Sequence, residues 1–553
     1  MTKADPGIDA VSLGIMWDRL VSLTDEILTT LVRSSFSSIA RESYDLSVVV
    51  LDADGNAIAQ GSYSVPSFTG TAAPTLRHML AKFPPETLRP GDVIATNDAW
   101  IGTGHLFDIS VMRPVFSGAR LIGYTLSISH LPDIGGVGFS TEATEIFHEG
   151  LRLPICKLAR EGEVDGFILD LFRANSRVPD QTIGDVMANI TCNEVGGRQL
   201  LEFMDDYGLD DLASLSRAIR DQAEAAMREK IRAWPDGTYD YEADLEGIDE
   251  PIRIAASVEV EGDGVSIDFG GTSGCVNRGI NVPFCYTRAM ANYAIKCLTV
   301  PSIPNNEGAI APIAIRAPEG CILNAQPPSP TGGRHLVGHF VTPAVFSALA
   351  EAAPSMAQAD CGMVSIVNFR GTHREGHRLS NLFFASGGFG ALEGQDGATT
   401  TPGPTNMAVV PVEIWEGLTS LTVLRKELAP DSGGPGAARG GVGQETVMRN
   451  DTGHPVTVFT MGYRTRFPAR GLLGGKDGQL RENRIEGEAV HPKGQFTLAP
   501  GEHISFLEAG GGGFGDPGGR DSALVLRDVR NGLVSVAGAK RDYGVEIDLG
   551  DLS

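Results

Sequence analysis

"TNDAWIGTGHLFDISVMRPVF", residues 96–116, is closely followed by "RLIGYTLSISHLPDIGG", residues 120–136. Each stretch joins a glycine-containing polar turn to an apolar, β-like run, which is typical of strands that end in functional loops. Upstream, residues 15–33 have the apolar spacing of an amphipathic helix, and residues 46–61 form two short apolar runs around an Asp-Gly turn, which predicts a hairpin. Residues 1–160 are therefore predicted to form a mixed α/β region.

The pattern changes twice further along the chain. Residues 161–236 consist of long helical stretches, whereas residues 237–553 are rich in short β-like runs and glycine loops. A chain of 553 residues is too long for one hydrophobic core, since domains usually hold about 100–200 residues. We therefore predict an α+β, multidomain protein with an α/β region, a central helical segment and a β-rich C-terminal half.

Composition excludes several classes of partner. The net charge is −24, which disfavours nucleic acid and anionic membrane surfaces, because both attract basic proteins. The chain has neither a signal-peptide pattern at its start nor an apolar run of about 20 residues, the length that spans a bilayer. Its seven cysteines are scattered without a CxxC motif, which predicts reduced thiols and a cytoplasmic protein.

The pattern His-x-x-Asp occurs in both opening stretches, as His105 with Asp108 and as His130 with Asp133. On a flat strand the two side chains of such a pair point to opposite faces, but a glycine-flanked loop can curl around an ion. Two imidazoles with carboxylates suit Zn²⁺, Mn²⁺ or Fe²⁺. The alternative is that each histidine only hydrogen-bonds a nearby aspartate, and the spacing alone leaves both interpretations open.

Other motifs are weaker. "HREGH", with His373 and His377, misplaces the glutamate of the zincin pattern, and its glycines disfavour a helix. "HLVGH", with His335 and His339, is predicted to serve packing. The glycine runs at 471–478 and 510–517 lack the spacing or the following helix of a nucleotide-binding loop. The sequence therefore offers a metal candidate and no nucleotide site.

These motifs resemble, nearly end to end, those of the hydantoinase B/oxoprolinase family. That family includes subunits of ATP-dependent cyclic amide hydrolases and of ketone carboxylases. The resemblance is carried by "RESYDLSVVVLDADG" (41–55), the two opening stretches, "STEATEIFHEGLRLP" (140–154), "FRANSR" (172–177), "INVPF" (280–284), "IPNNEG" (303–308), "PDSGGPGAARGGVG" (430–443) and "GGGGFGDP" (510–517). "TNDAW" and "TEIFHEG" depart from the family pattern, which affects the substrate-side loops more than the metal site.

The resemblance implies a ligand set of Asp45, His105, Asp108 and His130 for one divalent metal, with zinc favoured over manganese. Asp133 is then expected to orient an imidazole or a backbone turn. The resemblance places Asp98 near the site, with capping of a turn as its alternative role. Glu145 and Glu149 are the candidates for proton transfer, with surface or helix-start roles as the alternative.

The implied function is that of the metal-bearing B subunit of an ATP-dependent cyclic amide hydrolase. A partner A-type ATPase subunit, which binds ATP and Mg²⁺, would phosphorylate the carbonyl oxygen of a hydantoin, lactam or oxoproline-type ring. This chain would receive the activated small molecule within a hetero-oligomer. Two alternatives stay open: a subunit of an ATP-dependent ketone carboxylase, and a non-catalytic scaffold in which the metal only stabilises loops.

Overall fold

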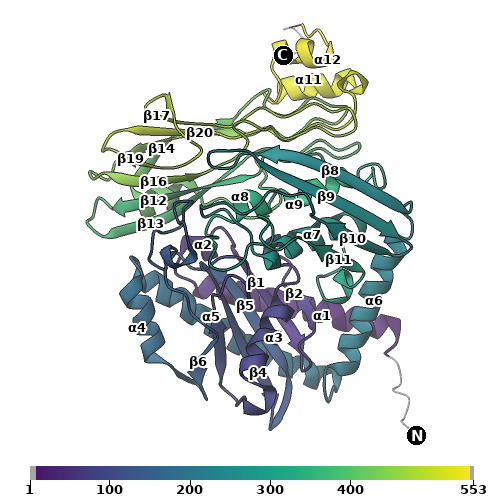
Figure 1. The fold of residues 1–553 in the computed structure, drawn as a ribbon, viewed down its shortest axis with the longest axis vertical. Coiled ribbons are helices and arrows are strands. Elements are labelled where there is room, and N and C mark those ends of the chain that lie inside the picture. Colours follow the sequence, from purple (N-terminus) through teal and green to yellow (C-terminus); the bar gives the residue numbers. More distant parts are fainter. Residues whose placement is uncertain (1–7, 549–553) are drawn as a thin grey trace.

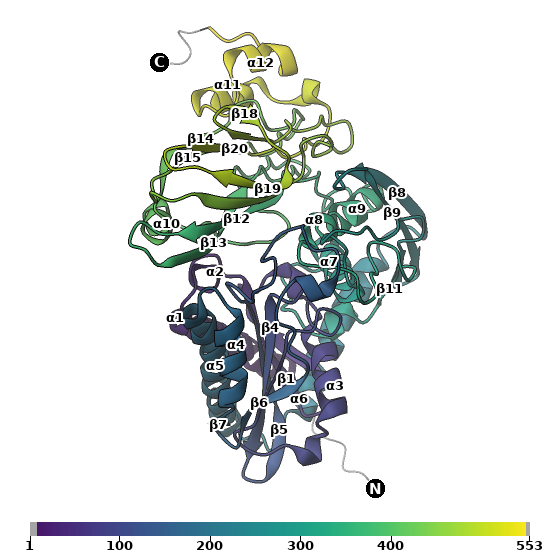
Figure 2. The ribbon, with the colours of Figure 1, turned by 60° about the vertical axis from the view of Figure 1, so that its left-hand side comes forward.

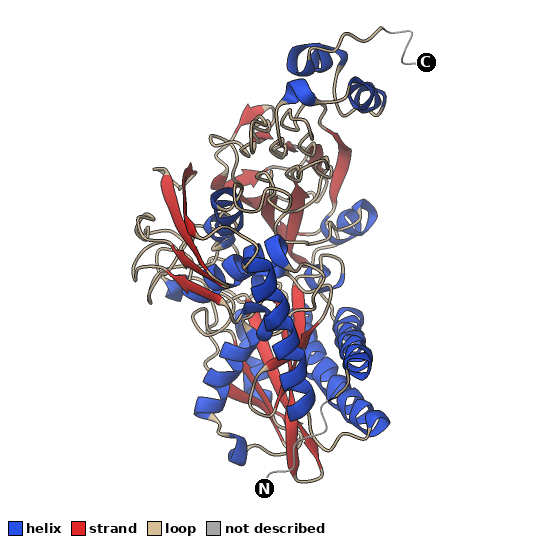
Figure 3. Cartoon of the chain, turned by 90° about the vertical axis from the view of Figure 1, so that its right-hand side faces the viewer, coloured by secondary structure: helices blue, strands red, loops and turns tan. Residues whose placement is uncertain are grey.

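The computed structural model of the protein describes residues 8–548. Helices and strands intermix along the chain and build four separate sheets, so the predicted α+β, multidomain class is confirmed (Figures 1 and 3). The N-terminal sheet lies at one end of the molecule, and the last helices lie at the other end (Figure 1).

The N-terminal sheet is antiparallel throughout and has seven strands in the order β2-β1-β5-β4-β3-β6-β7. The predicted hairpin at 46–61 forms β1 and β2, and the two stretches that open the sequence analysis supply β4 and β5. The strands are β1 (Leu46–Asp52), β2 (Ala57–Gln60), β3 (Val93–Thr96), β4 (Asp108–Ser117), β5 (Arg120–His130), β6 (Cys156–Arg160) and β7 (Glu163–Val164).

Helices cover both faces of this sheet. Val48 and Val50 of β1 pack in one core cluster with α1, whereas Val49 and Leu51 pack in another with α3, because successive side chains of a strand point to opposite faces. Figure 2 shows α5 on one side of the sheet and α3 on the other. The helices are α1 (Ala10–Ser34), α2 (Ser38–Arg41), α3 (Ala72–Lys82), α4 (Gly166–Asn175), α5 (Pro179–Tyr207) and α6 (Ala213–Ile231), with 3-10 turns η1 (Pro66–Phe68), η2 (Pro85–Thr87) and η3 (Ile146–His148).

The predicted helical segment 161–236 contains α4, α5 and α6. Helices α5 and α6 share a core cluster with α1 and β1, so this segment packs on the N-terminal sheet. The predicted division into three regions stays a prediction about domain boundaries. Within residues 8–548, no helix is both long and apolar enough to cross a membrane.

A four-stranded sheet with the order β11-β10-β9-β8 follows, and helices α7 and α9 belong to the same part of the chain (Figure 1). Helix α9 packs on strands β8 and β9. The elements are β8 (Gly237–Leu245), β9 (Ile252–Glu261), β10 (Gly264–Asp268), α7 (Phe284–Thr299), η4 (Gly308–Ile310), β11 (Ile313–Arg316), α8 (His335–Gly338) and α9 (Val341–Ala348).

Two further sheets, with orders β13-β12-β16-β19 and β14-β15-β20-β17-β18, pack face to face. Phe369 and Phe383 of the first sheet share a core with Met448 and Phe506 of the second. The elements are β12 (Val364–Thr372), β13 (Arg378–Ser386), α10 (Val412–Thr419), β14 (Leu421–Leu428), β15 (Gln444–Asn450), β16 (Val456–Met461), β17 (Glu482–Ile485), β18 (Glu488–Ala489), β19 (Lys493–Leu498) and β20 (His503–Leu507).

The glycine-rich runs of the C-terminal half form a stack of chains held by backbone hydrogen bonds. Gly441 donates to the carbonyl of Phe389 at 2.8 Å, and Gly511 donates to the carbonyl of Gly441 at 2.9 Å. A Cβ on Gly441 would lie 2.0 Å from the carbonyl oxygen of Ala398. Glycine is required here because neighbouring backbones occupy the space that any side chain needs.

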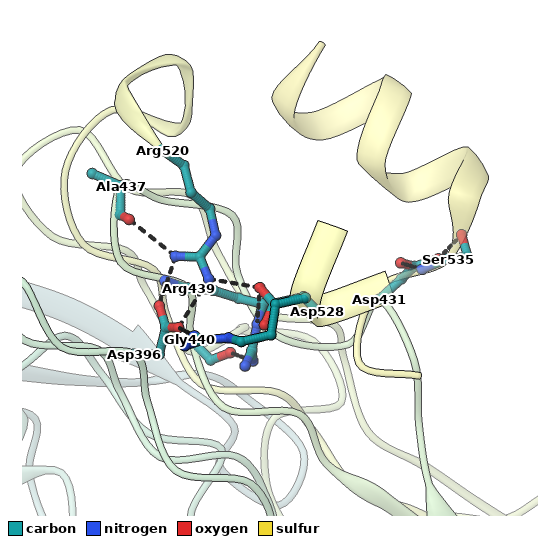
Figure 4. A network of polar contacts seen from close by, with 9 residues as sticks. Asp396, Asp431, Ala437, Arg439, Gly440, Arg520, Asp528 and Ser535 are labelled. Carbon is teal, nitrogen blue, oxygen red and sulfur yellow. Dashed lines mark hydrogen bonds and ion pairs between the residues drawn. The ribbon is translucent and has the colours of Figure 1, made fainter. Parts of the chain in front are cut away.

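The 3-10 turn η5 (Pro517–Gly519) precedes the C-terminal helices α11 (Ser522–Arg530) and α12 (Val536–Tyr543). Ser535, which caps α12, hydrogen-bonds to Asp431, and a buried ion network holds α11 (Figure 4). The guanidinium of Arg520 donates to Asp396 at 2.7 and 2.9 Å and to Asp528 at 2.6 Å. Arg439 also donates to Asp528, at 3.3 Å. Each buried charge therefore has an opposite partner, as burial demands.

Candidate metal centre

Three neighbouring strands place three predicted ligands at one edge of the N-terminal sheet. Asp45 directly precedes β1, His130 ends β5, and Asp108 begins β4. Strands β1 and β4 both run antiparallel to β5, which lies between them, so these three positions share one edge. Asp108 pairs with His130 in the register, and the His130 amide donates to the Asp45 carbonyl at 3.1 Å.

This placement corrects one expectation. His130 was expected in a glycine-flanked loop, but it is the last residue of a strand, and cross-strand pairing with Asp108 brings it to the site. The second His-x-x-Asp motif is therefore not a repeat of the first. Its aspartate, Asp133, binds the backbone amide of Arg177 and also the Arg177 guanidinium, at 2.7 Å. Asp133 thus orients a backbone turn, one of its two expected roles, and contacts no imidazole.

His105 reaches the site from the loop between β3 and β4. Asn97 fixes this loop by donating to the carbonyls of Leu106 at 2.7 Å and Leu151 at 2.9 Å. Gly104, just before His105, has a φ of +96°, a conformation that side chains other than glycine rarely adopt. The glycine-flanked loop predicted for the first motif therefore turns the His105 ring back toward Asp108.

The side chains of His105, Asp108 and His130 bring their ligand atoms together, as the ligands of a metal ion do. One ligand atom each from His105, Asp108 and His130 lies within 4.8 Å of the others, and all three residues are buried. The Nε2 of His105 is 2.9 Å from the Oδ1 of Asp108, yet neither atom has a hydrogen-bond partner of acceptable geometry. Both ring nitrogens of His130 also lack a partner. Buried polar atoms without partners are costly, and a cation between them would satisfy one nitrogen of each imidazole and the Oδ1 of Asp108.

The other polar atoms of these residues are engaged, which fixes their orientation. The Nδ1 of His105 lies 3.1 Å from the carbonyl of Gly332, so this nitrogen carries the proton and Nε2 presents a lone pair. The Oδ2 of Asp108 accepts from Arg334 at 2.8 Å and from the Thr103 hydroxyl at 2.5 Å. Asp108 is thereby left with Oδ1 free toward the two imidazoles.

Electrostatics keep the donors in the protonation states that a metal needs. Burial, aided by the Arg334 charge, lowers the pKa of His105, and burial lowers the pKa of His130 to about 3. Burial favours the acid form of Asp108, but the charge of Arg334, which donates to Oδ2, outweighs it and holds the pKa of Asp108 below its usual value. Near neutral pH the cluster thus offers two neutral imidazoles and one carboxylate.

Asp45 lines the same small cavity as the two imidazoles. The ligand atoms of His105, Asp108 and His130 lie within 4.8 Å of one another, and Asp45 does not belong to this group. Burial and the charge of Asp108 raise the pKa of Asp45. A divalent cation would reverse this effect by favouring the carboxylate.

The cavity itself has a volume of about 30 Å³, enough for an ion or a water molecule. His335, from the "HLVGH" motif, lines it with both ring nitrogens unpartnered and stacks on Phe139 at 5.6 Å. Sequence reasoning assigned His335 to packing and did not select Arg334. The only local signal was the histidine pair, since both residues reach the cavity by tertiary contact from the start of α8.

Glu149 is buried beside the site without lining the cavity. Its carboxylate accepts from the amides of Thr331 at 2.5 Å and Gly332 at 2.7 Å, and the Gly332 carbonyl faces His105. Burial raises the pKa of Glu149 to about 7. Glu149 therefore holds the backbone that orients a proposed ligand, and its role in proton transfer stays a prediction.

Glu145 and Asp98 have other partners. Glu145 is half-buried, and its Oε1 lies 3.2 Å from the Nε2 of His148, an arrangement that fits its alternative surface role. Asp98 accepts from the Trp100 amide at 3.0 Å and pairs with Arg152 at 2.5 Å, so it caps a turn. Neither residue is among those that line the metal cavity.

A separate group, His373, Glu375 and His377, lies at the turn between β12 and β13. The two rings stack at 4.2 Å between centroids, and only His373 is buried. The predicted absence of a zincin helix is confirmed, because these residues form a hairpin turn.

The model of the family described as hydantoinase B/oxoprolinase matches residues 9–517. The chain belongs to this family. It is 32% identical to the caprolactamase subunit beta of Pseudomonas jessenii over 98% of this chain and 97% of that protein. The crystal structure of the ATP-dependent caprolactamase from Pseudomonas jessenii superposes with a TM-score of 0.90 at 29% identity, covering 99% of this chain and 98% of that one. A nucleotide-free acetone carboxylase structure has a TM-score of 0.87 over 97% of this chain and 80% of that one, but at 18% identity it shows a shared fold alone.

Proposed function

We propose that this chain is the metal-binding B subunit of an ATP-dependent cyclic amide hydrolase, acting on substrate phosphorylated by an A-type ATPase subunit. The observation that carries the proposal is the buried group His105, Asp108 and His130, whose facing atoms lack hydrogen-bond partners. Likeness to a caprolactamase subunit along the whole chain supplies the substrate class.

The donor set fits one divalent transition metal. Two neutral imidazoles and one carboxylate, with Asp45 as a further carboxylate in the same cavity, suit zinc and, less well, manganese. Such a metal would supply Lewis acidity and an activated water molecule. We propose Asp45, His105, Asp108 and His130 as its ligands.

The chain's own residues position this chemistry. Arg334 balances the charge of Asp108 and orients its carboxylate. Glu149 fixes the backbone of Gly332, whose carbonyl accepts a hydrogen bond from the Nδ1 of His105. His335 adds an unpartnered imidazole, able to hydrogen-bond a water molecule or a small group that enters the cavity. Aromatic rings of Phe107 and Phe139 surround the histidines and exclude bulk water.

We propose activation by a second subunit on energetic grounds. A lactam is stabilised by resonance and has a poor leaving group, whereas phosphorylation of its oxygen creates a good one. The test is an assay of ring opening of caprolactam, hydantoin and 5-oxoproline with zinc and ATP, first with this chain alone and then with an A-type ATPase subunit added. We expect ring-opened product only in the second case.

The same assay separates the alternatives. Incorporation of labelled bicarbonate into a ketone, without ring opening, would identify a carboxylase subunit instead. Hydrolysis by the chain alone without ATP would overturn the two-subunit mechanism. Full activity of the complex after loss of the metal through His105→Ala would leave only a scaffold role.

A further inference from the structure

A second, much larger cavity lies beside the metal cavity. Its volume is about 330 Å³, within the range of small-molecule sites, and it is bounded by residues 62–69, by α7 and by residues 401–406. The metal cavity, at about 30 Å³, cannot hold a cyclic amide. Most of any substrate must therefore lie outside it.

The two cavities share their walls. In the segment around η1, Ser64 and Pro66 line the large cavity, whereas Val65 and Ser67 line the metal cavity. The segment 404–407 repeats this alternation, since residues 404 and 406 line the large cavity and residues 405 and 407 line the metal cavity. A single layer of chain thus separates them.

The large cavity contains a buried cation without a counter-charge. Lys296 of α7 is only 7% exposed, and the polar partner of its ammonium is the carbonyl of Ile303. Among the described residues 8–548, no carboxylate acts on its charge, and none lines the cavity. Burial lowers the pKa of Lys296 to about 8. An unpaired ammonium at such a place is costly unless a ligand brings negative charge.

The remaining polar lining suits the same ligand. Ser64 and Thr69 offer hydroxyl groups that can donate to an oxyanion, whereas the hydroxyls of Ser62 and Thr401 already donate to Asp25 and to the carbonyl of Thr399. Asn305 also lines the cavity, and its buried, unpartnered Oδ1 is an acceptor, which would face a donor group of the ligand and not its anionic end.

We propose that this cavity binds an oxyanion, with the Lys296 ammonium as its counter-charge. The source of the oxyanion rests on the proposed function: it is either the phosphoryl group of the activated substrate or the carboxylate of the ring-opened product. In both cases Lys296 is a binding residue that holds the anionic end of the molecule, on the other side of the chain layer that borders the metal cavity. Anion binding itself requires neither a metal nor the partner subunit.

The test uses the full-length chain freed of metal, so that anions cannot bind to a metal ion. Calorimetry measures the binding of inorganic phosphate and, in a separate arm, of acetate. We expect at least one anion to bind, and the Lys296→Met exchange to weaken it by at least about tenfold, since a charge-assisted contact is lost. Lys296→Arg should retain most of the affinity.

Lys82→Met is the matched control. Lys82 also donates to a backbone carbonyl, that of Ile155, but does not line the cavity, so its exchange should leave anion affinity unchanged. Binding of phosphate alone would identify the phosphoryl group as the ligand, and binding of acetate alone would identify the carboxylate. Failure of both anions to bind, or equal binding by Lys296→Met, would overturn the proposal.

Cys297 provides a readout in the unmodified protein, should Lys296→Met not fold. Its half-buried thiol lines the same cavity, whereas the thiol of Cys275 is exposed elsewhere. The bound anion should slow modification of Cys297 by methyl methanethiosulfonate, followed by peptide mass mapping, and leave Cys275 unaffected. Equal rates at Cys297 with and without the anion would contradict the site. If the chain binds an anion but its complex with the A-type ATPase subunit opens no ring, the hydrolase function would be rejected while the anion site would stand.

Discussion

Replacing His130 with phenylalanine should abolish metal binding without destabilising the metal-free protein. The ring of His130 stacks on Phe107 at 5.4 Å and meets Phe139 edge-on at 5.2 Å, and a phenyl ring can keep both contacts. What the exchange removes are two nitrogens that have no hydrogen-bond partner.

The magnitude follows from these nitrogens. A buried polar group without a partner costs about 1–3 kcal/mol, so the metal-free His130→Phe variant should be as stable as the parent or more stable by up to about that amount. Loss of a residue that merely supports a ligand lowers metal affinity about 10–100-fold, so loss of a ligand should cost at least about 100-fold. At a metal concentration 100 times the Kd, the parent alone should gain about 2.7 kcal/mol.

The assay combines elemental analysis with thermal unfolding, each with and without zinc. One kcal/mol shifts the Tm of a domain-sized unit by about 2–4 °C. The higher Tm of the metal-free variant and the rise in Tm that zinc gives only to the parent are therefore both measurable. His373→Phe is the matched control, because His373 is also a buried histidine with an unpartnered Nε2, but it lies at the β12–β13 turn. Retention of metal by His130→Phe, or its loss from His373→Phe, would refute the ligand assignment. Strong destabilisation of the metal-free His130→Phe variant would show that the His130 nitrogens have partners.

Three further results are expected. Glu149→Ala should weaken zinc binding by about 10–100-fold in a competition titration, because the Gly332 backbone that orients His105 loses its anchor, whereas Glu145→Ala should bind zinc normally. Gly441→Ala should lower the yield of folded protein, judged by circular dichroism and gel filtration, because its Cβ would lie 2.0 Å from a carbonyl oxygen. Finally, calorimetry of the isolated chain with ATP and Mg²⁺ should detect no micromolar binding, and such binding would return the phosphorylation step to this chain.

The sequence pattern predicts elements well where a signal is local. The amphipathic spacing at 15–33 predicts a helix, and the helix observed is longer, Ala10–Ser34, because Asp9 caps its start by accepting from the amides of Val11 and Ser12. The hairpin of β1 and β2 was likewise predicted from its Asp-Gly turn. Both features depend on residues close together in the chain.

The site was predictable only in part. His105 and Asp108 belong to a local motif. The apparent repeat at His130 and Asp133 is misleading, because strand pairing places His130 beside Asp108 while Asp133 forms an ion pair with Arg177. Lys296 has no motif at all. Its importance arises from burial opposite distant segments, which no spacing in the sequence encodes.

The glycine runs also bear on the proposed division of the chemistry between two chains. A phosphate-binding loop needs free backbone amides that point at the nucleotide. In the run 471–478, which faintly resembles such a loop, the amides of Leu472 and Lys476 donate to the carbonyls of Gly513 and Pro435. These amides hold the glycine stack together and are therefore unavailable to a nucleotide. The run 471–478 therefore offers no phosphate-binding loop, which supports the proposal that the ATP-dependent step takes place on a partner subunit.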